Sequence, residues 1–299
     1  MITGRGTPAR RRSGGSGKMT GVPCRQAVLD SASGAVASVG SLRVRWTHAS
    51  SYAGLSPASL VHQARLRRVR RQLRSLDLPD RGLLVDLGCS DGFVLSELRA
   101  AADVPPGWRM HGYDRRVRWV KAARRRRLPK SRFRLLDLND ESARTREQGD
   151  VVTCLETLEH VGDYRSALQV IHQAVRPGGR LILSMPVEVG PVGLVKLLGR
   201  PLARRRPYAD FFASPSQRLS YAAAVASGGD IGRYRSPARL AWGPHLGFDH
   251  RAVRDHIRHR YVETSLWTIE DVQHSAFGAN VFLLVRRTDE ERAPDDTTG

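Results

Sequence analysis

Hydrophobic residues repeat in two different ways between residues 56 and 186. Leu66, Val69, Leu73 and Leu76 recur at intervals of three and four, behind Ser56-Pro57, which suits a helix cap and first turn. This predicts an amphipathic helix whose other face is either solvated or in contact with phosphates, and that face carries Arg65, Arg67, Arg68, Arg71 and Arg74. After Pro79, short apolar runs alternate with helical segments. Because parallel strands are buried on both faces, the alternation predicts an α/β domain.

The alternation defines five parallel strands and the helices between them. We expect strands at 83–87, 109–113, 133–136, 150–155 and 180–185. We expect helices at 93–102 and 117–127, and a third that Asp163 caps and Pro177-Gly178-Gly179 closes. Two later apolar runs, 261–269 and 280–286, are only about ten residues apart, which is too close for a crossover helix. The prediction is a doubly wound, mostly parallel seven-stranded sheet with an antiparallel final strand.

Composition divides the chain into segments. Residues 1–40 are rich in Gly, Ser and Arg and predict a disordered basic tail, although Met19 is an alternative start. Residues 41–80 predict a helical extension, 81–287 the main domain, and 288–299 a second disordered tail. Within the domain, 187–250 predicts an inserted lid with short helical pieces at most. Its aromatic residues either cover an acceptor or form a small core of their own, and they are Phe211, Phe212, Tyr221, Tyr234 and Trp242.

Several classes of protein are disfavoured. No apolar run approaches the roughly 18 residues that a membrane span needs. The Arg-Arg-Arg run at 10–12 has no apolar stretch behind it, so it is not an export signal. Three cysteines, an odd number without close pairing, argue against a disulfide framework or a zinc knuckle. We therefore expect a cytoplasmic location.

The net charge of +20 has two possible origins. Lysine occupies only four positions, so 45 of the 49 cations are arginine, which points to a genome rich in arginine codons. The stretch 115–134 nevertheless holds eleven cations and no acid, so this part of the surface is either solvated or bound to polyanions.

The turn after the first strand carries the most specific chemistry. Residues 86–93 read Asp-Leu-Gly-Cys-Ser-Asp-Gly-Phe, and the two glycines allow a close backbone approach and a sharp turn. A dinucleotide-binding loop would have glycine where Ser90 and Phe93 stand. The carboxylate of Asp86 would also repel a pyrophosphate. The loop therefore favours a ligand that carries a cation.

Five motifs in order resemble those of the class I S-adenosylmethionine-dependent methyltransferases. They are the loop at 85–92, Gly112-Tyr113-Asp114, Leu136-Asp137-Leu138, Leu158-Glu159-His160-Val161 and the segment 176–181, Arg-Pro-Gly-Gly-Arg-Leu. The resemblance is close over about residues 80–187 and extends to 286 by topology. It implies a Rossmann-like fold and S-adenosylmethionine as the cofactor.

The resemblance also assigns roles to residues. Asp86 and Gly88 would hold the methionine part of the cofactor, in a loop that includes Ser90 and Gly92. Asp114 would bind the ribose hydroxyls, unless it caps the following helix. Asp137 would accept the adenine amino group, unless it is an ordinary turn acid, and Leu138 would contact the ring. Cys154 in the fourth strand completes the set.

Catalysis of methyl transfer depends mainly on alignment, because the sulfonium is already an activated electrophile. A general base helps when the acceptor is a hydroxyl. His160 is the first candidate, unless it only satisfies nearby backbone groups, and His245 and His250 are the second candidates. No cluster with metal-ligand spacing is evident in the sequence, so we expect no metal.

The Leu-Glu-His-Val motif resembles the subfamily that acts on small molecules, quinones, sugars and natural products. The motif with which methyltransferases of bases grip a flipped base is absent after the fourth strand. We therefore expect O-methylation of a small-molecule, glycan or natural-product acceptor by direct in-line transfer. An RNA methyltransferase that uses the basic surface and a non-catalytic cofactor-binding scaffold are the alternatives.

Overall fold

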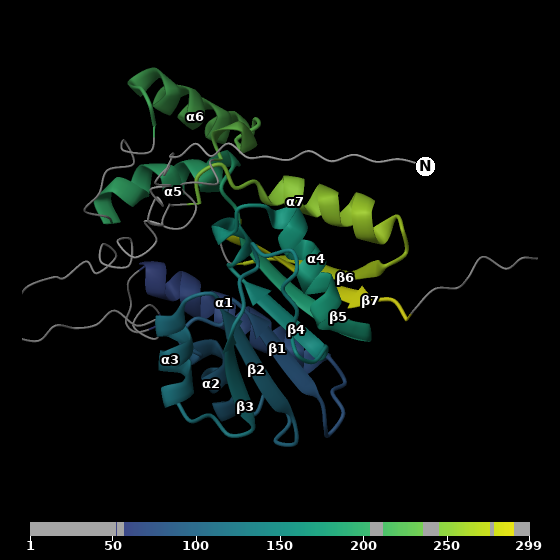
Figure 1. Cartoon of the computed structure of the whole chain (residues 1–299). Coiled ribbons are helices and arrows are strands. Elements are labelled where there is room, and N and C mark those ends of the chain that lie inside the picture. The colour runs from purple at the N-terminus through teal and green to yellow at the C-terminus, as the bar shows by residue number, and fades with distance from the viewer. Residues whose placement is uncertain (1–51, 53–56, 204–211, 236–244, 276–277, 290–299) are drawn as a thin grey trace, which may run out of the picture. The chain divides into compact units, whose positions relative to one another are not determined.

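The protein is built around one seven-stranded sheet, seen here in a computed structural model (Figure 1). The structure describes residues 52, 57–203, 212–235, 245–275 and 278–289. The strands are β1 (Leu83–Leu87), β2 (Arg109–Asp114), β3 (Ser131–Leu135), β4 (Gly149–Leu155), β5 (Val175–Pro186), β6 (Trp267–His274) and β7 (Asn280–Arg287). Their order is β3-β2-β1-β4-β5-β7-β6, and β7 runs antiparallel to both of its neighbours. The predicted Rossmann-like sheet with an antiparallel end is confirmed.

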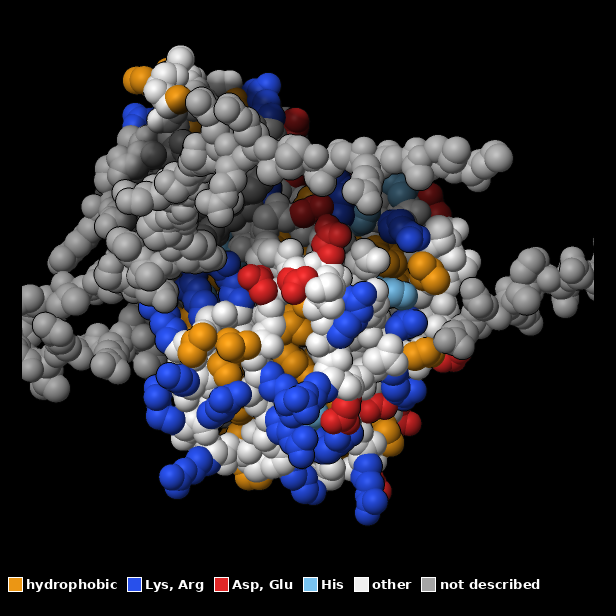
Figure 2. Space-filling model, viewed as in Figure 1, with side chains coloured by type: hydrophobic (Ala, Val, Ile, Leu, Met, Phe, Trp, Pro, Cys, Tyr) orange, Lys and Arg blue, Asp and Glu red, His pale blue; other side chains and the backbone are white. Residues whose placement is uncertain are grey.

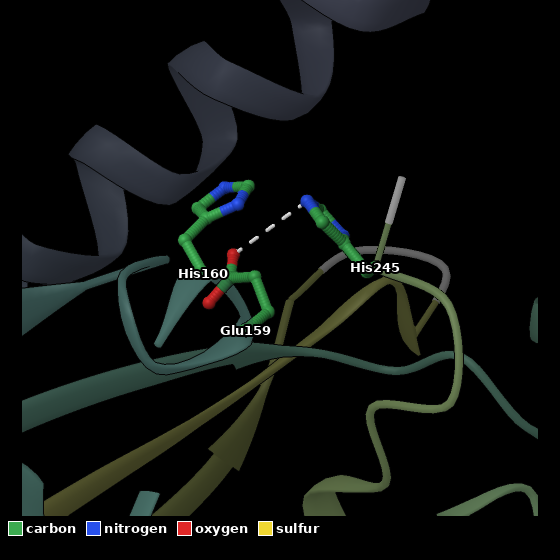
Figure 3. A group of neighbouring side chains, drawn as sticks. All are labelled: Glu159, His160 and His245. Atoms are coloured by element: carbon green, nitrogen blue, oxygen red, sulfur yellow. Dashed lines mark ion pairs between the residues drawn. The ribbon is translucent and has the colours of Figure 1, made fainter. Parts of the chain in front are cut away.

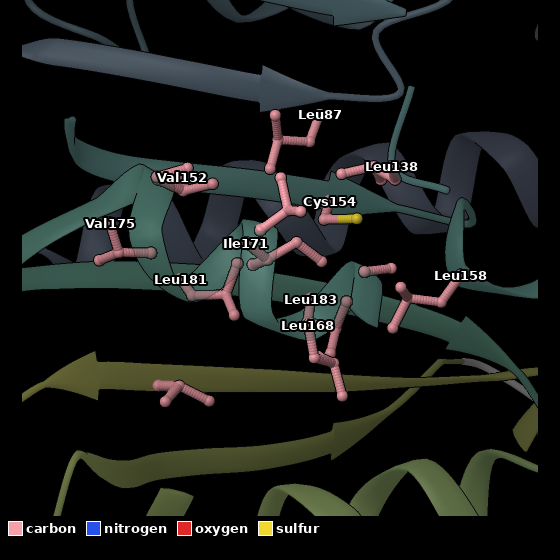
Figure 4. Packing of buried hydrophobic residues seen from close by; sticks show 14 of the residues in the cluster. Leu87, Leu138, Val152, Cys154, Leu158, Leu168, Ile171, Val175, Leu181 and Leu183 are labelled. Carbon is pink, nitrogen blue, oxygen red and sulfur yellow. The ribbon is translucent and has the colours of Figure 1, made fainter. Parts of the chain in front are cut away.

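Helices cover both faces of this sheet. On one face lie α1 (Pro57–Ser75), α2 (Phe93–Ala100) and α3 (Val117–Arg125), packed over a core that includes Leu73, Leu95 and Trp108. On the other lie α4 (Tyr164–Ala174) and α7 (His250–Ile257). Figure 4 shows Leu168 and Ile171 of α4 against the strand residues of that second core. Every residue of β1 is buried, as its unbroken apolar run predicts.

The segment after β5 differs from its prediction. Instead of short pieces it forms two full helices, α5 (Gly190–Ala203) and α6 (Pro215–Ser227), followed by a 3-10 turn at Gly232–Tyr234. The side chain of Ser214 caps α6, and Gly228 ends it in a left-handed conformation. Tyr221 contacts Phe212 and Tyr234, so these rings form a core of the insert. Phe211 and Trp242 lie outside the described residues.

Three boundaries also differ. α4 ends at Ala174 and β5 begins at Val175, so 177–179 belongs to the strand and does not close the helix. Residues 258–262 form a π-helical turn, and β6 starts only at Trp267. Tyr261 stacks on Trp267 with 4.1 Å between the ring centroids. The apolar residues of this run therefore pack against each other and do not form one continuous strand. Thr288, assigned to the tail, donates a backbone hydrogen bond to the carbonyl of Leu266.

Most residues at the two ends of the chain are not among the described residues. The tail predicted at 1–40 lies outside the described residues, as do residues 290–299. The helical extension predicted at 41–80 contains α1. Among the described helices, none combines the length and the apolar character needed to cross a bilayer.

Candidate active site

A cavity of about 290 Å³ opens where β1, β2, β3 and β4 end. Open parallel sheets bind ligands at this edge, beyond the carboxyl ends of the strands. Seven of the predicted site residues line it, namely Asp86, Gly88, Ser90, Asp114, Asp137, Leu138 and His160. The loops that the sequence motifs single out therefore converge on one space.

The loop after β1 is held in an unusual backbone conformation. Gly88 has φ 85°, and a side chain there would collide with Thr157. Ser90 stands where the family more often has glycine, and it adopts φ 50° all the same. The backbone N–H groups of Gly88 and Cys89 both donate to the carbonyl of Tyr113, at 2.8 and 2.9 Å. These bonds fix the loop against the end of β2.

Asp114 fastens the same loop from the side. Its Oδ2 accepts from the Ser90 N–H at 3.0 Å, and its Oδ1 accepts from the Arg116 N–H at 2.8 Å. Burial raises the pKa of this carboxyl, and the two hydrogen bonds oppose that effect. Arg116 is the N-cap residue of α3, so Asp114 bonds to the residue before the helix and does not cap the first turn, while its side chain lines the cavity.

Asp86 lies at the floor of the cavity. It is 3 % exposed, and its Oδ1 accepts a hydrogen bond from the Thr153 hydroxyl at 2.7 Å. Burial raises the pKa of Asp86 to about 7, so its charged form is poorly stabilised without a ligand. A cation arriving beside it would restore that stabilisation.

Asp137 and Leu138 form the wall after β3. The carboxylate of Asp137 accepts from the backbone and the side-chain amide of Asn139, at 3.0 and 2.6 Å. It therefore closes a local turn, as the simpler interpretation of this acid predicts, while also lining the cavity.

Three predicted residues lie elsewhere. Gly92, at the start of α2, faces Ala123 and Phe133, and it does not belong to the cavity lining. Cys154 is fully buried in the core under α4, where burial raises the pKa of its thiol. His250 begins α7, lines no part of the cavity, and has a pKa lowered by burial to about 4. A position in or near a motif therefore does not by itself bring a residue to the cavity.

The sequence analysis missed the cavity's contribution from the N-terminal side. Arg65 is 6 % exposed and lines the cavity together with Tyr52, so it does not belong to the solvated face to which we assigned it. Its Nη1 lies 3.3 Å from Oε2 of Glu156. The fivefold arginine pattern on α1 gave no sign that one member points inward.

Glu156 joins this ion pair to the sheet. Its Oε1 accepts from the Ser184 hydroxyl at 3.0 Å, and its Oε2 accepts from the Asn280 side chain at 2.7 Å. Its backbone has φ 49°, an uncommon value for a residue with a side chain. The charge and the backbone of this residue are thus both held where β4 ends.

A second group of side chains adjoins the cavity at His160. Glu159 and His160 lie on the 3-10 turn Leu158–His160 after β4, and His245 comes from the end of the insert. One ligand atom from each of the three lies within 4.8 Å of the others, and His245 Nε2 is 3.9 Å from Glu159 Oε1 (Figure 3). The sequence names His160 and His245 as separate candidates. It could not show that they meet at Glu159, because His245 is distant in the chain.

The protonation of this cluster follows from its burial. Glu159 is 1 % exposed, and neither carboxylate oxygen has a hydrogen-bond partner among the described residues. Burial raises the pKa of Glu159 and lowers that of His160 to about 3, so His160 is neutral at physiological pH. A buried carboxylate without a partner beside neutral imidazole is the donor set that a divalent cation uses.

Two residues of the insert hold the cluster in place. Glu188 Oε1 is 3.0 Å from Nδ1 of His245. Arg235 Nη2 donates to the carbonyls of Leu158, Glu159 and Val161, at 3.3, 3.4 and 2.8 Å. The insert therefore contacts both the backbone and the side chains of the site.

Comparison with known families gives this geometry a context. The family model described as "Methyltransferase domain" matches residues 60–227. The chain belongs to this methyltransferase family. The resemblance drawn from the five motifs is thereby confirmed.

Curated methyltransferase relatives match a shorter part of the chain. The "Ubiquinone biosynthesis O-methyltransferase" of Aeromonas salmonicida (strain A449) is 36% identical over 104 residues, which is 34% of this chain and 42% of that protein. The protein of the same name from Pseudomonas syringae pv. tomato is 35% identical over 104 residues, 34% of this chain and 43% of its own. The chain thus spans about two-fifths of the length of these relatives.

Solved methyltransferase structures agree in fold. Magnesium protoporphyrin IX methyltransferase from Synechocystis PCC 6803 has a TM-score of 0.51 at 16% identity, covering 80% of this chain and 92% of its own. The CMeT domain of the citrinin polyketide synthase has a TM-score of 0.51 at 15% identity, covering 80% and 55%. At such identities the likeness describes the fold of this chain and nothing more.

Proposed function

We propose that this protein transfers a methyl group from S-adenosylmethionine to a hydroxyl oxygen of a small-molecule acceptor. The observation that carries the proposal is the meeting of two sets of groups at one edge of the sheet. Acids on three strand ends line the cavity, and the Glu159–His160–His245 cluster adjoins it at His160. The first set suits the cofactor and the second suits an acceptor that must lose a proton.

The cofactor assignment uses the cavity's charges. Asp86 and the Gly88 turn suit the cationic methionine end, and Arg65 is the buried cation that suits its carboxylate. Asp114 suits the ribose hydroxyls, because a carboxylate oxygen can accept more than one hydrogen bond. Asp137 and Leu138, further along the wall, suit the adenine amino group and ring. Gly92 and Cys154 support the loop and the core.

The reaction needs alignment and a path for one proton. The acceptor oxygen attacks the methyl carbon while the carbon–sulfur bond breaks, which leaves S-adenosylhomocysteine as a neutral thioether. The hydroxyl proton passes to a base beside the acceptor. His245 suits this role, because Glu188 holds its Nδ1 and leaves Nε2 facing Glu159. His160, whose pKa is lowered to about 3, is a weak base and suits positioning or ligation.

The same cluster fits a divalent cation, contrary to the sequence expectation of no metal. The fit rests on the Glu159 carboxylate, which is buried and has no hydrogen-bond partner among the described residues. Glu159, His160 and His245 would hold the ion, and their mixed nitrogen and oxygen donors suit Mn²⁺ or Zn²⁺. When bound, such an ion would lower the pKa of a coordinated hydroxyl, and His245, with Nε2 on the ion, would then not act as the base. Glu188 would then hold Nδ1 of His245 and so orient Nε2 toward the ion.

The proposed acceptor is a small aromatic or lipid-like hydroxyl compound. Support comes from the relatives named for ubiquinone biosynthesis and from the helical insert beside the Glu159–His160–His245 cluster. An RNA acceptor has no base-gripping motif to support it. The non-catalytic alternative is separated from the proposal by the test below.

The test combines binding with turnover. Titration calorimetry with S-adenosylmethionine and S-adenosylhomocysteine should give micromolar binding, and a labelled methyl group should then appear on one member of a catechol and quinol panel. His245→Asn should bind both cofactor forms as the wild type does but should lose most transfer. His259→Asn, an exposed histidine on the π-helical turn, is the matched control. Cofactor binding without transfer to any hydroxyl, with divalent ions present, would favour the scaffold alternative.

A further inference from the structure

Cations gather over α3 and β3, on the face of the sheet that also carries α1 and α2. The stretch 115–134 holds eleven Lys and Arg residues and no acid. α3 buries only Val120 and Ala123, and its four cations Arg118, Lys121, Arg124 and Arg125 are exposed. Eight of the eleven cations are exposed, and the others are Arg116, Arg126 and Arg134. Figure 2 shows Lys and Arg side chains spread over the region where Figure 1 places these elements.

Part of this surface is concave. Between the end of α3 and β3 lies a hollow whose lining is mostly basic, made by Arg124, Arg127, Arg132 and Arg134 together with Leu128, Ser131 and Phe133. The Nε atom of Arg134 is shielded from solvent and has no hydrogen-bond partner among the described residues. One guanidinium group can donate two parallel hydrogen bonds to a phosphate. Four guanidinium groups around one hollow therefore form a suitable site for a phosphate group.

The basic surface is also long. α3 has nine residues and therefore measures about 13 Å. At its other end Arg115, Arg116 and Trp119 line the cofactor cavity. Arg118 lies over the Trp119 ring at 4.9 Å, which combines an aromatic face with a cation. A ligand that follows this surface must carry several anionic groups in a row.

Two kinds of ligand carry anionic groups in this way, a nucleic-acid strand and an anionic bilayer. A bilayer surface requires apolar side chains that insert among the headgroups along with the cations. The exposed large apolar residues of this face are Val117 and Leu135, at 52% and 53%, and both lie at the cavity end. No exposed large apolar residue is found in the lining of the hollow among the described residues, which favours a nucleic-acid strand over a bilayer.

We propose that the α3–β3 face binds the phosphate backbone of a single-stranded nucleic acid, with one phosphate in the arginine-lined hollow. Binding would be insensitive to sequence and sensitive to salt, because it rests on charge and on stacking against Trp119. The proposal goes beyond the proposed function and does not depend on it. The hollow lies beside the start of β3, at the opposite end of the strand from the catalytic cavity.

The test is fluorescence anisotropy with a labelled single-stranded RNA of about 20 nucleotides, longer than the site of one binding fold. The full-length protein is compared with Arg127→Asn/Arg132→Gln, which removes two cations of the hollow. Asparagine is used at 127 because that residue has φ 50°, which asparagine tolerates. The matched control is Arg218→Gln/Arg254→Gln, which removes two exposed arginines from α6 and α7.

The wild type and the control should bind alike, and the hollow variant should bind roughly tenfold more weakly at low salt. The slope of log affinity against log salt should fall by about 1.4, which is 0.7 for each lost phosphate contact. A second variant, Lys121→Gln/Arg125→Gln on exposed positions of α3, should give a similar loss with the hollow intact. Thermal melting of each variant establishes that it is folded.

Three results would overturn the proposal. One is equal affinity of the wild type and both face variants for the RNA. Another is an equal loss in the control, which would mean that the arginine excess of the whole chain is responsible. The third is binding to vesicles of anionic phospholipid, weakened by the face variants, without binding to the RNA. None of these results affects the proposed methyl transfer, which is measured with small acceptors.

Discussion

Nδ1 of His245 lies 3.0 Å from Oε1 of Glu188, a carboxylate that is almost completely buried. An imidazole can donate from one nitrogen and accept at the other, so the partner of Nδ1 decides what Nε2 can do. Glu188 thereby leaves Nε2 of His245 available on the side of Glu159, whose Oε1 is 3.9 Å away. Two buried carboxylates thus define the orientation of one histidine from the insert.

Replacing Glu188 tests this orientation. Glu188→Gln should lower kcat by about 10- to 100-fold, the usual effect of losing a partner that orients a functional histidine. Cofactor affinity should not change, because Glu188 does not line the cavity. Glu188→Asp should restore part of the rate.

The control for Glu188 is Glu270→Gln on β6, which removes an acid that pairs with Arg180. A fall in kcat that Glu188→Asp does not partly restore, together with a lower Tm, would contradict the positioning role and indicate a structural one.

Asp114 is expected to contribute to cofactor affinity. Asp114→Ala should weaken binding of S-adenosylhomocysteine by about 1–3 kcal/mol, the cost of leaving buried polar groups unpaired. Calorimetric titration measures this directly. Since Asp114 also holds the Ser90 loop, Asp114→Asn is made in parallel, and it should retain part of the affinity. Asp255→Ala on α7 is the control, and an unchanged affinity in Asp114→Ala would exclude the ribose assignment.

Asp86 links cofactor binding to stability through pH. Its pKa is raised to about 7 by burial, whereas an unfolded aspartate titrates near ~3.9. As pH rises between these values the unfolded chain releases a proton that the folded chain keeps, so the stability of the free protein falls. Asp86→Asn should therefore raise the Tm at pH 8 and leave it nearly unchanged at about pH 4. The Thr153 hydroxyl can still donate to the amide oxygen.

The same charge that destabilises the free protein should favour the cationic cofactor. Affinity for S-adenosylmethionine should increase from pH 6 to pH 8 in the wild type, as Asp86 ionises, and this increase should be absent in Asp86→Asn. Thermal scans and titrations at these pH values test both effects. An equal Tm difference at pH 4 and pH 8 would mean that titration of Asp86 is not the cause.

The Glu159–His160–His245 cluster is expected to bind a divalent ion. Titration with Mn²⁺ and with Zn²⁺ should show one site per chain, and Glu159→Gln and His245→Asn should each weaken it at least tenfold, because each removes one ligand atom from a set of three. His259→Asn, whose Nδ1 is 3.0 Å from Glu263 on the surface, should bind as the wild type does. Metal affinity that is indifferent to Glu159 would place the ion elsewhere.

Local sequence patterns were sufficient for the sheet and for most of the cofactor cavity. Asp86 lies near the end of β1, Asp114 is the last residue of β2 and Asp137 comes two residues after β3. The carboxyl ends of parallel strands meet at one edge of the sheet. The apolar run before each of them therefore predicted both the element and the position of the acid.

The features that were missed depend on contacts between distant segments. Arg65 is one arginine among five on α1, and only its ion pair with Glu156 distinguishes it. His245 was itself a predicted candidate, but its place beside the Leu158–His160 turn depends on the fold of the insert, whose helices the glycines and prolines of that segment concealed. Gly92 and Cys154 belong to motifs or strands at the site, but their positions face the packing side.

The left-handed backbone of Glu156 has a consequence for which substitutions this chain can accept. Glycine would suit φ 49° best, yet it would release Arg65, Ser184 and Asn280 together. Most other residues would meet the same backbone penalty and lose the carboxylate as well, while aspartate would keep a carboxylate on a side chain one methylene shorter. Position 156 therefore has two opposed requirements, a positive φ and a carboxylate. A saturation library at this codon, selected for activity, should return glutamate most often, with neither glycine nor alanine able to replace it.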